Sequence, residues 1–205
     1  MLDHTSWYGQ STLLFQNGKR IWFDPWRLKD GVPKADILFI THAHGDHLSP
    51  EDVDRIQERG TVLIGPPDCL EPLKGATKHI VKPGDELEIE GLKIKVVPAY
   101  NLEKTFHPKA NNWVGFIVDI GGVLYYSAGD TDHIPEMRGI RADVAFLPIG
   151  GTYTMDAAEA AGAAGEIKPK MAVPYHYGTV VGTDEDALRF QQLSSVPVTI
   201  MKKAE

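Results

Sequence analysis

The chain has 205 residues, of which 42% are hydrophobic and 24% charged, and its formal net charge is −7. This balance is typical of one globular domain, here predicted over residues 1–205, with no apolar run long enough to cross a bilayer. The acidic charge disfavours a protein that binds nucleic-acid backbones, which would carry a basic face, and the single cysteine, Cys69, excludes an intramolecular disulfide framework.

The N-terminal segment shows no export signal. "MLDHTSWYGQST" has neither the basic flank nor the apolar stretch of a signal peptide. We therefore expect a cytoplasmic protein without integral membrane association.

Short β-like runs broken by Gly, Pro and Asn dominate the chain. Residues 87–97, "LEIEGLKIKVV", alternate apolar and charged side chains, which predicts a sheet with one solvent-exposed face. "FIVDIGGVLYYS" predicts a hairpin, because Gly121-Gly122 can supply the positive φ of its turn. The predicted strands are residues 11–17, 19–24, 36–41, 61–65, 79–82, 85–91, 92–100, 112–121, 122–129, 144–149, 171–176 and 196–201.

Capping residues predict three helix starts. Ser49 with Asp52, and Thr183 with Asp186, follow the N-cap pattern, and a third helix is expected within residues 155–169. The strands arrive mostly in succession, without a helix after each. This order predicts a β-sandwich with helices packed outside it and disfavours a doubly wound parallel sheet.

Three histidines and an aspartate follow the apolar run "DILFIT" within six residues, in "HAHGDH". His42 and His44 are two residues apart, so on extended backbone both side chains point to one side. Gly45 allows a sharp turn that brings Asp46 and His47 round on its far side. An ordinary solvent-exposed loop does not explain three histidines so close together. The spacing indicates two pairs of ligands for two divalent ions, which metallohydrolases hold roughly 3.5–4 Å apart.

Two further residues end apolar strands in the same way. Asp130, in "YYSAGDTD", could bridge both ions, and His176, in "MAVPYHYGT", could complete the ligand set. Alone, Asp130 would be interpreted as an aspartate that starts a turn and His176 as a core histidine. The histidine cluster favours a role as ligands for both.

The motifs "THAHGDH", "AGDT" and "PYHYGT", in that order at strand ends, resemble those of the metallo-β-lactamase superfamily. "SWYGQSTLLFQNGKRIWFDPW" resembles the first hairpin and the following Asp-Pro of that superfamily. The branch most similar is that of small hydrolases related to the L-ascorbate-6-phosphate lactonases and, more distantly, to the N-acylphosphatidylethanolamine phospholipases. The resemblance covers roughly residues 5–200. It implies an α/β (α+β) fold, a four-layer αββα sandwich, with the site along one edge between the sheets.

The resemblance also implies a ligand set. One ion would take His42 and His44, the other Asp46, His47 and His176, and Asp130 would lie between them. The family usually has a further histidine directly after a strand such as "IKVVPAY", where this chain has Asn101. We favour His107 as the replacement, because imidazole is a better transition-metal ligand than an amide. Asn101 itself, or a weakly held first ion, is the alternative. Gln10 also stands where this branch often has a histidine.

The predicted activity is hydrolysis by a hydroxide bound between two divalent ions, which lower the pKa of water from about 15.7 toward neutrality. Asp46 and Asp130 are the predicted catalytic residues, because they would orient the hydroxide and one of them would move the proton. His133, Asn101 and Tyr177 are candidate substrate-binding residues. Packing is the simpler role for Tyr177, as it is for Tyr153 and Tyr175.

Zinc suits an N/O ligand set with open coordination best, and manganese or iron would also fit. The predicted partner is a small ester, lactone or phosphodiester, and self-association is common in small hydrolases of this type. "EKTFHPKANNW" is the predicted pocket rim. Lys104 and Lys109 could meet an anionic group there, although an exposed basic loop is the preferred interpretation.

Three other functions are alternatives for a chain with these motifs. Diiron redox relatives typically have a glutamate in place of the second histidine of the cluster, so His44 disfavours that role. A nuclease is disfavoured by the acidic composition and by the lack of an inserted RNA-gripping domain. A non-catalytic, metal-stabilised domain is the third alternative, although structural zinc sites are usually closed and often rich in cysteine.

Overall fold

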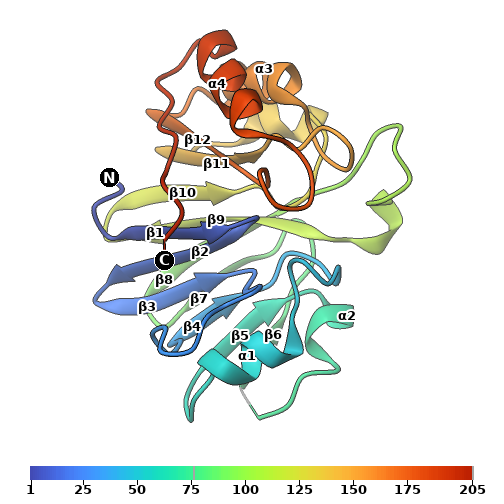
Figure 1. The fold of residues 1–205 in the computed structure, drawn as a ribbon. Coiled ribbons are helices and arrows are strands. Elements are labelled where there is room, and N and C mark those ends of the chain that lie inside the picture. The colour runs from blue at the N-terminus through green and yellow to red at the C-terminus, as the bar shows by residue number, and fades with distance from the viewer. Residues whose placement is uncertain (76, 205) are drawn as a thin grey trace.

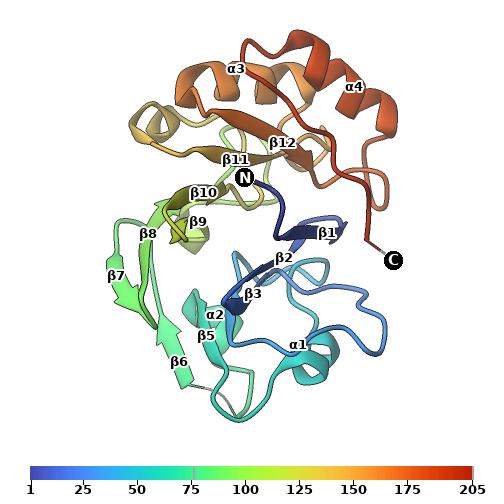
Figure 2. The same ribbon diagram turned by 90° about the vertical axis from the view of Figure 1, so that its left-hand side faces the viewer.

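The structure is a computed structural model that describes residues 1–75 and 77–204. Two six-stranded sheets stack face to face, with helices on the two outer faces (Figures 1 and 2). This is the predicted four-layer αββα sandwich. Each sheet keeps its strands in sequence order, β1 to β6 in sheet A and β7 to β12 in sheet B.

Sheet A forms the N-terminal half. Its strands are β1 (Thr5–Gly9), β2 (Thr12–Asn17), β3 (Lys19–Phe23), β4 (Ile37–Phe39), β5 (Val62–Gly65) and β6 (Thr77–Ile80). The first three are antiparallel, and β3 to β6 run parallel. Helices α1 (Pro50–Ile56) and α2 (Pro67–Leu70) cover its outer face through a core that includes Trp22, Leu38, Val53 and Leu70.

Sheet B forms the C-terminal half. Its strands are β7 (Glu86–Ile89), β8 (Leu92–Pro98), β9 (Val114–Ile120), β10 (Val123–Ser127), β11 (Val144–Pro148) and β12 (Met171–Tyr175). Strands β7 to β10 are antiparallel and β10 to β12 parallel. The remaining elements are η1 (Lys109–Asn111), η2 (Pro135–Gly139), α3 (Ala157–Ile167) and α4 (Asp184–Leu193). Helices α3 and α4 lie over β11 and β12 (Figure 2).

Phenylalanines join the two sheets at the centre of the sandwich. The rings of Phe39 and Phe116 lie 4.9 Å apart, and those of Phe15 and Phe146 lie 5.9 Å apart. All four side chains are buried, and tilted or edge-to-face pairs of this kind add to the free energy gained by burying apolar surface. The rigid interior fixes where the strand ends lie, and the polar residues described below follow those ends.

The predicted helix starts are confirmed. The Ser49 hydroxyl accepts from Asp52 N, and Thr183 and Asp156 each cap a helix through a capping box. Gly121 and Gly122 form the predicted β9–β10 turn, both with positive φ.

Three local predictions were wrong. Residues 196–201 form no strand, because Pro197 lacks the N–H that a ladder needs, and only one bridge joins Val198 to Ala172. The predicted helices did not include α2, residues 67–70, which Pro67 begins at its first turn. Strand β1 was absent from the predicted strands, although the resemblance included it in a first hairpin.

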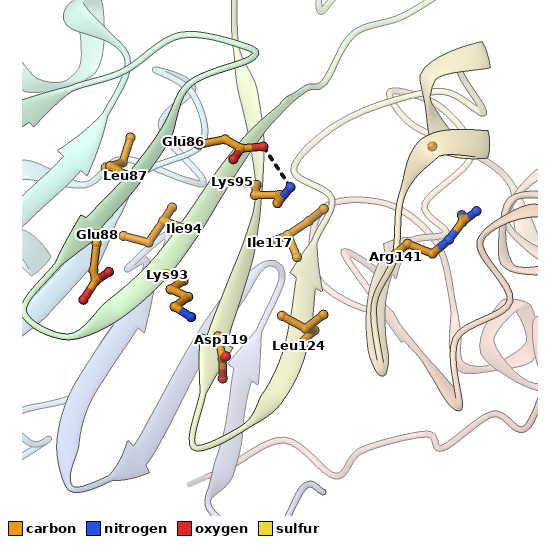
Figure 3. Close-up of a pocket in the computed structure, with 11 residues that line it drawn as sticks. Glu86, Leu87, Glu88, Lys93, Ile94, Lys95, Ile117, Asp119, Leu124 and Arg141 are labelled. Atoms are coloured by element: carbon orange, nitrogen blue, oxygen red, sulfur yellow. Dashed lines mark hydrogen bonds and ion pairs between the residues drawn. The ribbon is translucent and has the colours of Figure 1, made fainter.

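The predicted solvent-exposed face lies on the outside of β7 to β10 (Figure 3). Glu86 on β7 pairs with Lys95 on β8 at 2.8 Å, and Ile117 and Leu124 form the apolar floor of a groove of about 470 Å³. This groove is as large as the cavity described below, but it holds none of the histidines. Within the described residues, no helix is long and apolar enough to span a membrane.

Candidate metal centre

The segments that follow β4, β8, β10 and β12 meet at one edge of the sandwich. Thr41 O accepts from Val114 N at 3.2 Å, which ties the end of β4 to the start of β9. Gly129, after β10, donates its N–H to the hydroxyl of Tyr175, at the end of β12, at 2.8 Å. Gly129 has a φ of +66°, and a Cβ there would lie 2.8 Å from Val114 O, so this crossing requires glycine.

Seven histidine and aspartate side chains gather at this edge in three groups, and within each group the ligand atoms lie within 4.8 Å of one another. Two of the groups correspond to the two ligand sets expected from the sequence, with His107 as the third histidine of the first set. All seven are buried except His44 and Asp46, which are partly exposed. The groups are His42, His44, His107; His42, His47, Asp130; and Asp46, His47, His176.

Asp130 lies between the two sets. Its Oδ2 is 3.3 Å from His107 Nε2 and 3.0 Å from His176 Nε2. Its Oδ1 is 3.2 Å from His47 Nε2. One carboxylate therefore reaches a histidine of the first set and two of the second, which is the position expected of a bridging ligand.

The donor atoms of the cluster fit divalent transition-metal ions. Among the described residues, Nε2 of His42, His47 and His107 and Oδ1 of Asp130 are buried without a hydrogen-bond partner. Buried polar atoms of this kind are costly unless something binds them. Imidazole nitrogens and carboxylate oxygens are the usual ligands of zinc, and they also suit manganese and iron. The residues present therefore match the metal that the sequence predicted.

Asp24, which follows β3, fixes the orientation of two histidines. Its Oδ2 accepts from His47 Nδ1 at 2.8 Å and from Thr41 Oγ1 at 2.7 Å, and its Oδ1 accepts from Thr41 N at 2.8 Å. The Thr41 oxygen in turn accepts from His42 Nδ1 at 3.0 Å. Both rings thus carry a proton on Nδ1 and present Nε2 to the cluster, as metal-binding histidines commonly do.

Asp24 was not among the site residues predicted from the sequence. Its signal in the sequence is the Asp-Pro pair of "IWFDPW", which carries part of the family resemblance. Its role depends on Thr41 and His47, which are far from it in sequence, so the pattern alone did not reveal it.

Burial and neighbouring charges shift the pKa values of the cluster. Burial, and then the nearby His47, hold the pKa of His42 well below its ordinary value. Burial also acts to lower the pKa of His47, but the carboxylates of Asp130 and Asp24 outweigh it and raise this pKa well above the usual range. Burial opposes ionisation of Asp130 too, yet His176 and His47 hold its pKa well below the ordinary value. An ionised Asp130 and a neutral His42 can accept a cation, whereas His47 must lose its Nε2 proton when a cation binds.

Asn101 lies behind His107. Its Nδ2 donates to Asp132 Oδ1 at 3.0 Å and to Tyr153 O at 2.9 Å. These two bonds orient the amide so that Oδ1 accepts from both Nδ1 and the backbone N–H of His107, each at 3.0 Å. His107 consequently turns Nε2 toward Asp130. This arrangement favours His107 over Asn101 as the third ligand, and it places Asn101 away from the cavity in which a substrate would bind.

Replacing Asn101 by alanine should weaken binding of one ion by about 10- to 100-fold, because the His107 ring loses the acceptor that orients it. Metal affinity would be measured by competition with a chelating dye. Asn111→Ala, at an exposed position of the same loop, is the matched control and should bind metal like the unmodified protein. Equal affinities for the two variants would show that Asn101 does not position the ligand.

Gln10 also reaches the cluster, from the turn between β1 and β2. Its Nε2 lies 2.7 Å from Asp46 Oδ2 and 2.9 Å from His176 Nε2. Its backbone oxygen accepts from His176 N at 2.9 Å, which ties the loop after β12 to this turn. The family resemblance marked this position because relatives have a histidine there, but the sequence assigned no role to the glutamine.

Two candidate substrate-binding residues lie away from the cluster. His133 pairs with Glu166 of α3 at 3.2 Å and packs against Gly162. Tyr177 is buried and stacks on Trp7, with ring centroids 5.1 Å apart. Neither residue lines the cavity beside the histidines. His133 is held against α3, and Tyr177 is held against Trp7 of β1.

A cavity of about 480 Å³ opens beside the cluster. Its polar floor consists of four of the candidate ligands, and apolar side chains from three segments form its rim. It is lined by His44, Gly45, Asp46, Phe106, His107, Asp130, Tyr153 and Val180. A concave, mainly apolar site with a few convergent polar groups is the usual form of a small-molecule site.

Comparisons with known proteins identify relatives of the chain. A family model described as a beta-lactamase superfamily domain matches residues 4–176. A UPF0173 metal-dependent hydrolase from Thermoplasma acidophilum is 33% identical over 202 residues, which covers 92% of this chain and 89% of the relative.

Solved structures give the same result. A protein from Parabacteroides distasonis has a TM-score of 0.86 and 32% identity, covering 98% of this chain and 93% of its own. Igni18, a metallo hydrolase from Ignicoccus hospitalis, has a TM-score of 0.80 and 28% identity, covering 98% and 95%. On this evidence the chain belongs to the metallo-β-lactamase superfamily.

Proposed function

We propose that the protein is a metal-dependent hydrolase that cleaves an ester, lactone or phosphodiester bond of a small molecule by means of two divalent ions. The observation that supports this most directly is the position of Asp130 between two sets of histidine-rich ligands beside an open cavity. The relatives named metal-dependent hydrolases support the same general activity.

In this proposal, His42, His44 and His107 would hold one ion, and Asp46, His47 and His176 would hold the other. The Asp130 carboxylate, which lies between the two ligand sets, would serve both. When bound, such ions lower the pKa of water toward neutrality and polarise the oxygen of the bond that is cleaved. Zinc is the proposed metal, because the donors are nitrogen and oxygen atoms and the cavity leaves coordination positions open to ligands.

Asp46 is the proposed proton carrier. Unlike the buried Asp130, it is partly exposed and lines the cavity, so it can reach both the attacking water and a leaving group. Gln10 Nε2 occupies its Oδ2, which leaves Oδ1 as the oxygen available to receive the proton and return it to the leaving group.

The test is metal content together with turnover. We expect two ions per chain by elemental analysis, and metal-dependent cleavage of at least one member of a panel of esters, lactones and phosphodiesters. A chelator should stop turnover and lower the melting temperature, because ligand binding stabilises the folded state by about 2.7 kcal/mol at a hundred times Kd. A chelator that lowers the melting temperature while every substrate stays uncleaved would indicate a structural metal site instead.

The narrower resemblance to ascorbate-6-phosphate lactonases stays a prediction, as do the cytoplasmic location, self-association and the single domain over residues 1–205. Each concerns a property other than the geometry of the cluster. The choice among ester, lactone and phosphodiester depends on the side chains of the cavity rim.

A further inference from the structure

We infer that the cavity takes an uncharged ester or lactone carrying an aromatic or branched aliphatic group, and that Phe106, Tyr153 and Val180 bind this group. The inference rests on the proposed hydrolase function and selects among the substrate classes left open there.

The apolar rim is the first observation. Phe106 and Val180 are large hydrophobic side chains that are 44% and 47% exposed, and they come from separate segments, after β8 and after β12. Phe106 meets Tyr153 edge to face, with ring centroids 4.7 Å apart and planes at 90°. Exposed apolar side chains that gather around the mouth of a cavity mark a surface that binds apolar ligands. The rim therefore favours a substrate with an apolar group next to the bond that is cleaved.

The engagement of the nearby lysines is the second observation. Lys104 Nζ donates to Asp132 Oδ1 at 2.7 Å and to Thr154 O at 3.0 Å. Lys109 Nζ donates to Glu136 at 2.9 Å and lies over the Tyr100 ring. The sequence left a role in meeting an anionic group open for both lysines. Their bonds hold them to the protein instead.

Phosphate groups are usually recognised by arginine or lysine side chains that pair with their oxygens. Among the described residues, the cavity lining includes neither of these side chains, and it exposes the carboxylate of Asp46. Outside the proposed metal ligands, the described lining therefore offers a phosphate monoester or diester no cationic side chain to pair with. An uncharged ester or lactone needs no such partner and gains contact with the three rim side chains.

The experiment compares an aromatic ester, a small aliphatic ester and a phosphodiester. Zinc-loaded protein would be assayed with ethyl phenylacetate, ethyl acetate and bis(4-nitrophenyl) phosphate. We expect kcat/KM to be about 10- to 100-fold higher for the phenylacetate than for the acetate, the range that apolar contacts in a pocket provide. Phe106→Ala should remove most of this preference, chiefly through KM. Leu188→Ala, which truncates an exposed leucine on α4, is the matched control and should retain it.

A binding measurement separates the inference from the proposed activity. Calorimetry on zinc-loaded protein would compare phenylacetohydroxamic acid with acetohydroxamic acid, and we expect about tenfold tighter binding of the phenyl compound, lost in Phe106→Ala. Equal binding of the two, or preferred turnover of the phosphodiester, would overturn the inference and leave the hydrolase proposal standing. If the binding preference holds but none of the substrates is cleaved, the proposed activity fails and the ligand preference remains.

Discussion

Asp130→Ala is expected to reduce kcat/KM by about a thousandfold. Lewis-acid stabilisation by a bound ion is worth several kcal/mol, and each 1.36 kcal/mol corresponds to a factor of ten in rate. Asp130 Oδ2 lies 3.0 Å from His176 Nε2 and 3.3 Å from His107 Nε2. Removing this carboxylate takes away an anionic ligand from both proposed ion positions and leaves their positive charges to repel each other.

The measurement is turnover together with metal content per chain. We expect the Asp130→Ala protein to hold at most one ion and to keep its circular dichroism spectrum, because Asp130 contributes to the cluster and not to the phenylalanine core. Asp54→Ala, an exposed carboxylate on α1, is the matched control and should keep both ions and normal turnover. Two ions per chain and unchanged turnover in Asp130→Ala would refute the bridging role.

The fold and most of the cluster could be predicted because their signals are local. Alternation along β7 and β8, the Gly121-Gly122 turn and the capping residues are each read within a few neighbouring positions. The ligands after β4, β10 and β12 share one pattern, in which a histidine or aspartate follows an apolar strand within three residues. Such strand ends meet because the two sheets pack face to face.

The supporting residues could not be predicted, since their roles arise from contacts between distant segments. Gln10 reaches the cluster from the turn between β1 and β2, and Asp24 reaches it from the end of β3. Asp132 holds Asn101 and Lys104 from the loop after β10. His133 shows the converse error. It lies close to Asp130 in sequence, but its side chain turns to Glu166 on α3. Nearness in sequence is therefore a weak guide to the direction of a side chain in a loop.

Asp24→Asn should weaken metal binding by about 10- to 100-fold, the usual effect of changing the partner of a metal-bound histidine. The variant should also lose about 1–3 kcal/mol of folding free energy. The carboxylate accepts from three donors, one on Oδ1 and two on Oδ2. An asparagine has only one acceptor oxygen, so its amide group would face at least one of these buried donors and leave it unpaired.

Chemical denaturation in the presence of chelator would give the stability change, and dye competition would give the affinity. Asp36→Asn is the matched control, because Asp36 also accepts several bonds but pairs with Arg20 at the surface. It should lose some stability without losing metal affinity. Affinity equal to that of the unmodified protein in Asp24→Asn would show that the carboxylate does not orient His47.

A double variant sharpens this test. Thr41→Val removes the hydroxyl that donates to Asp24 and accepts from His42. We expect Asp24 and Thr41 to form one hydrogen-bond network behind the two histidines. The double variant Asp24→Asn/Thr41→Val should then lose less metal affinity than the sum of the losses in the two single variants. If the two losses of metal affinity are strictly additive, each residue acts on its own histidine, and the hydrogen bond between Asp24 and Thr41 contributes no coupling energy.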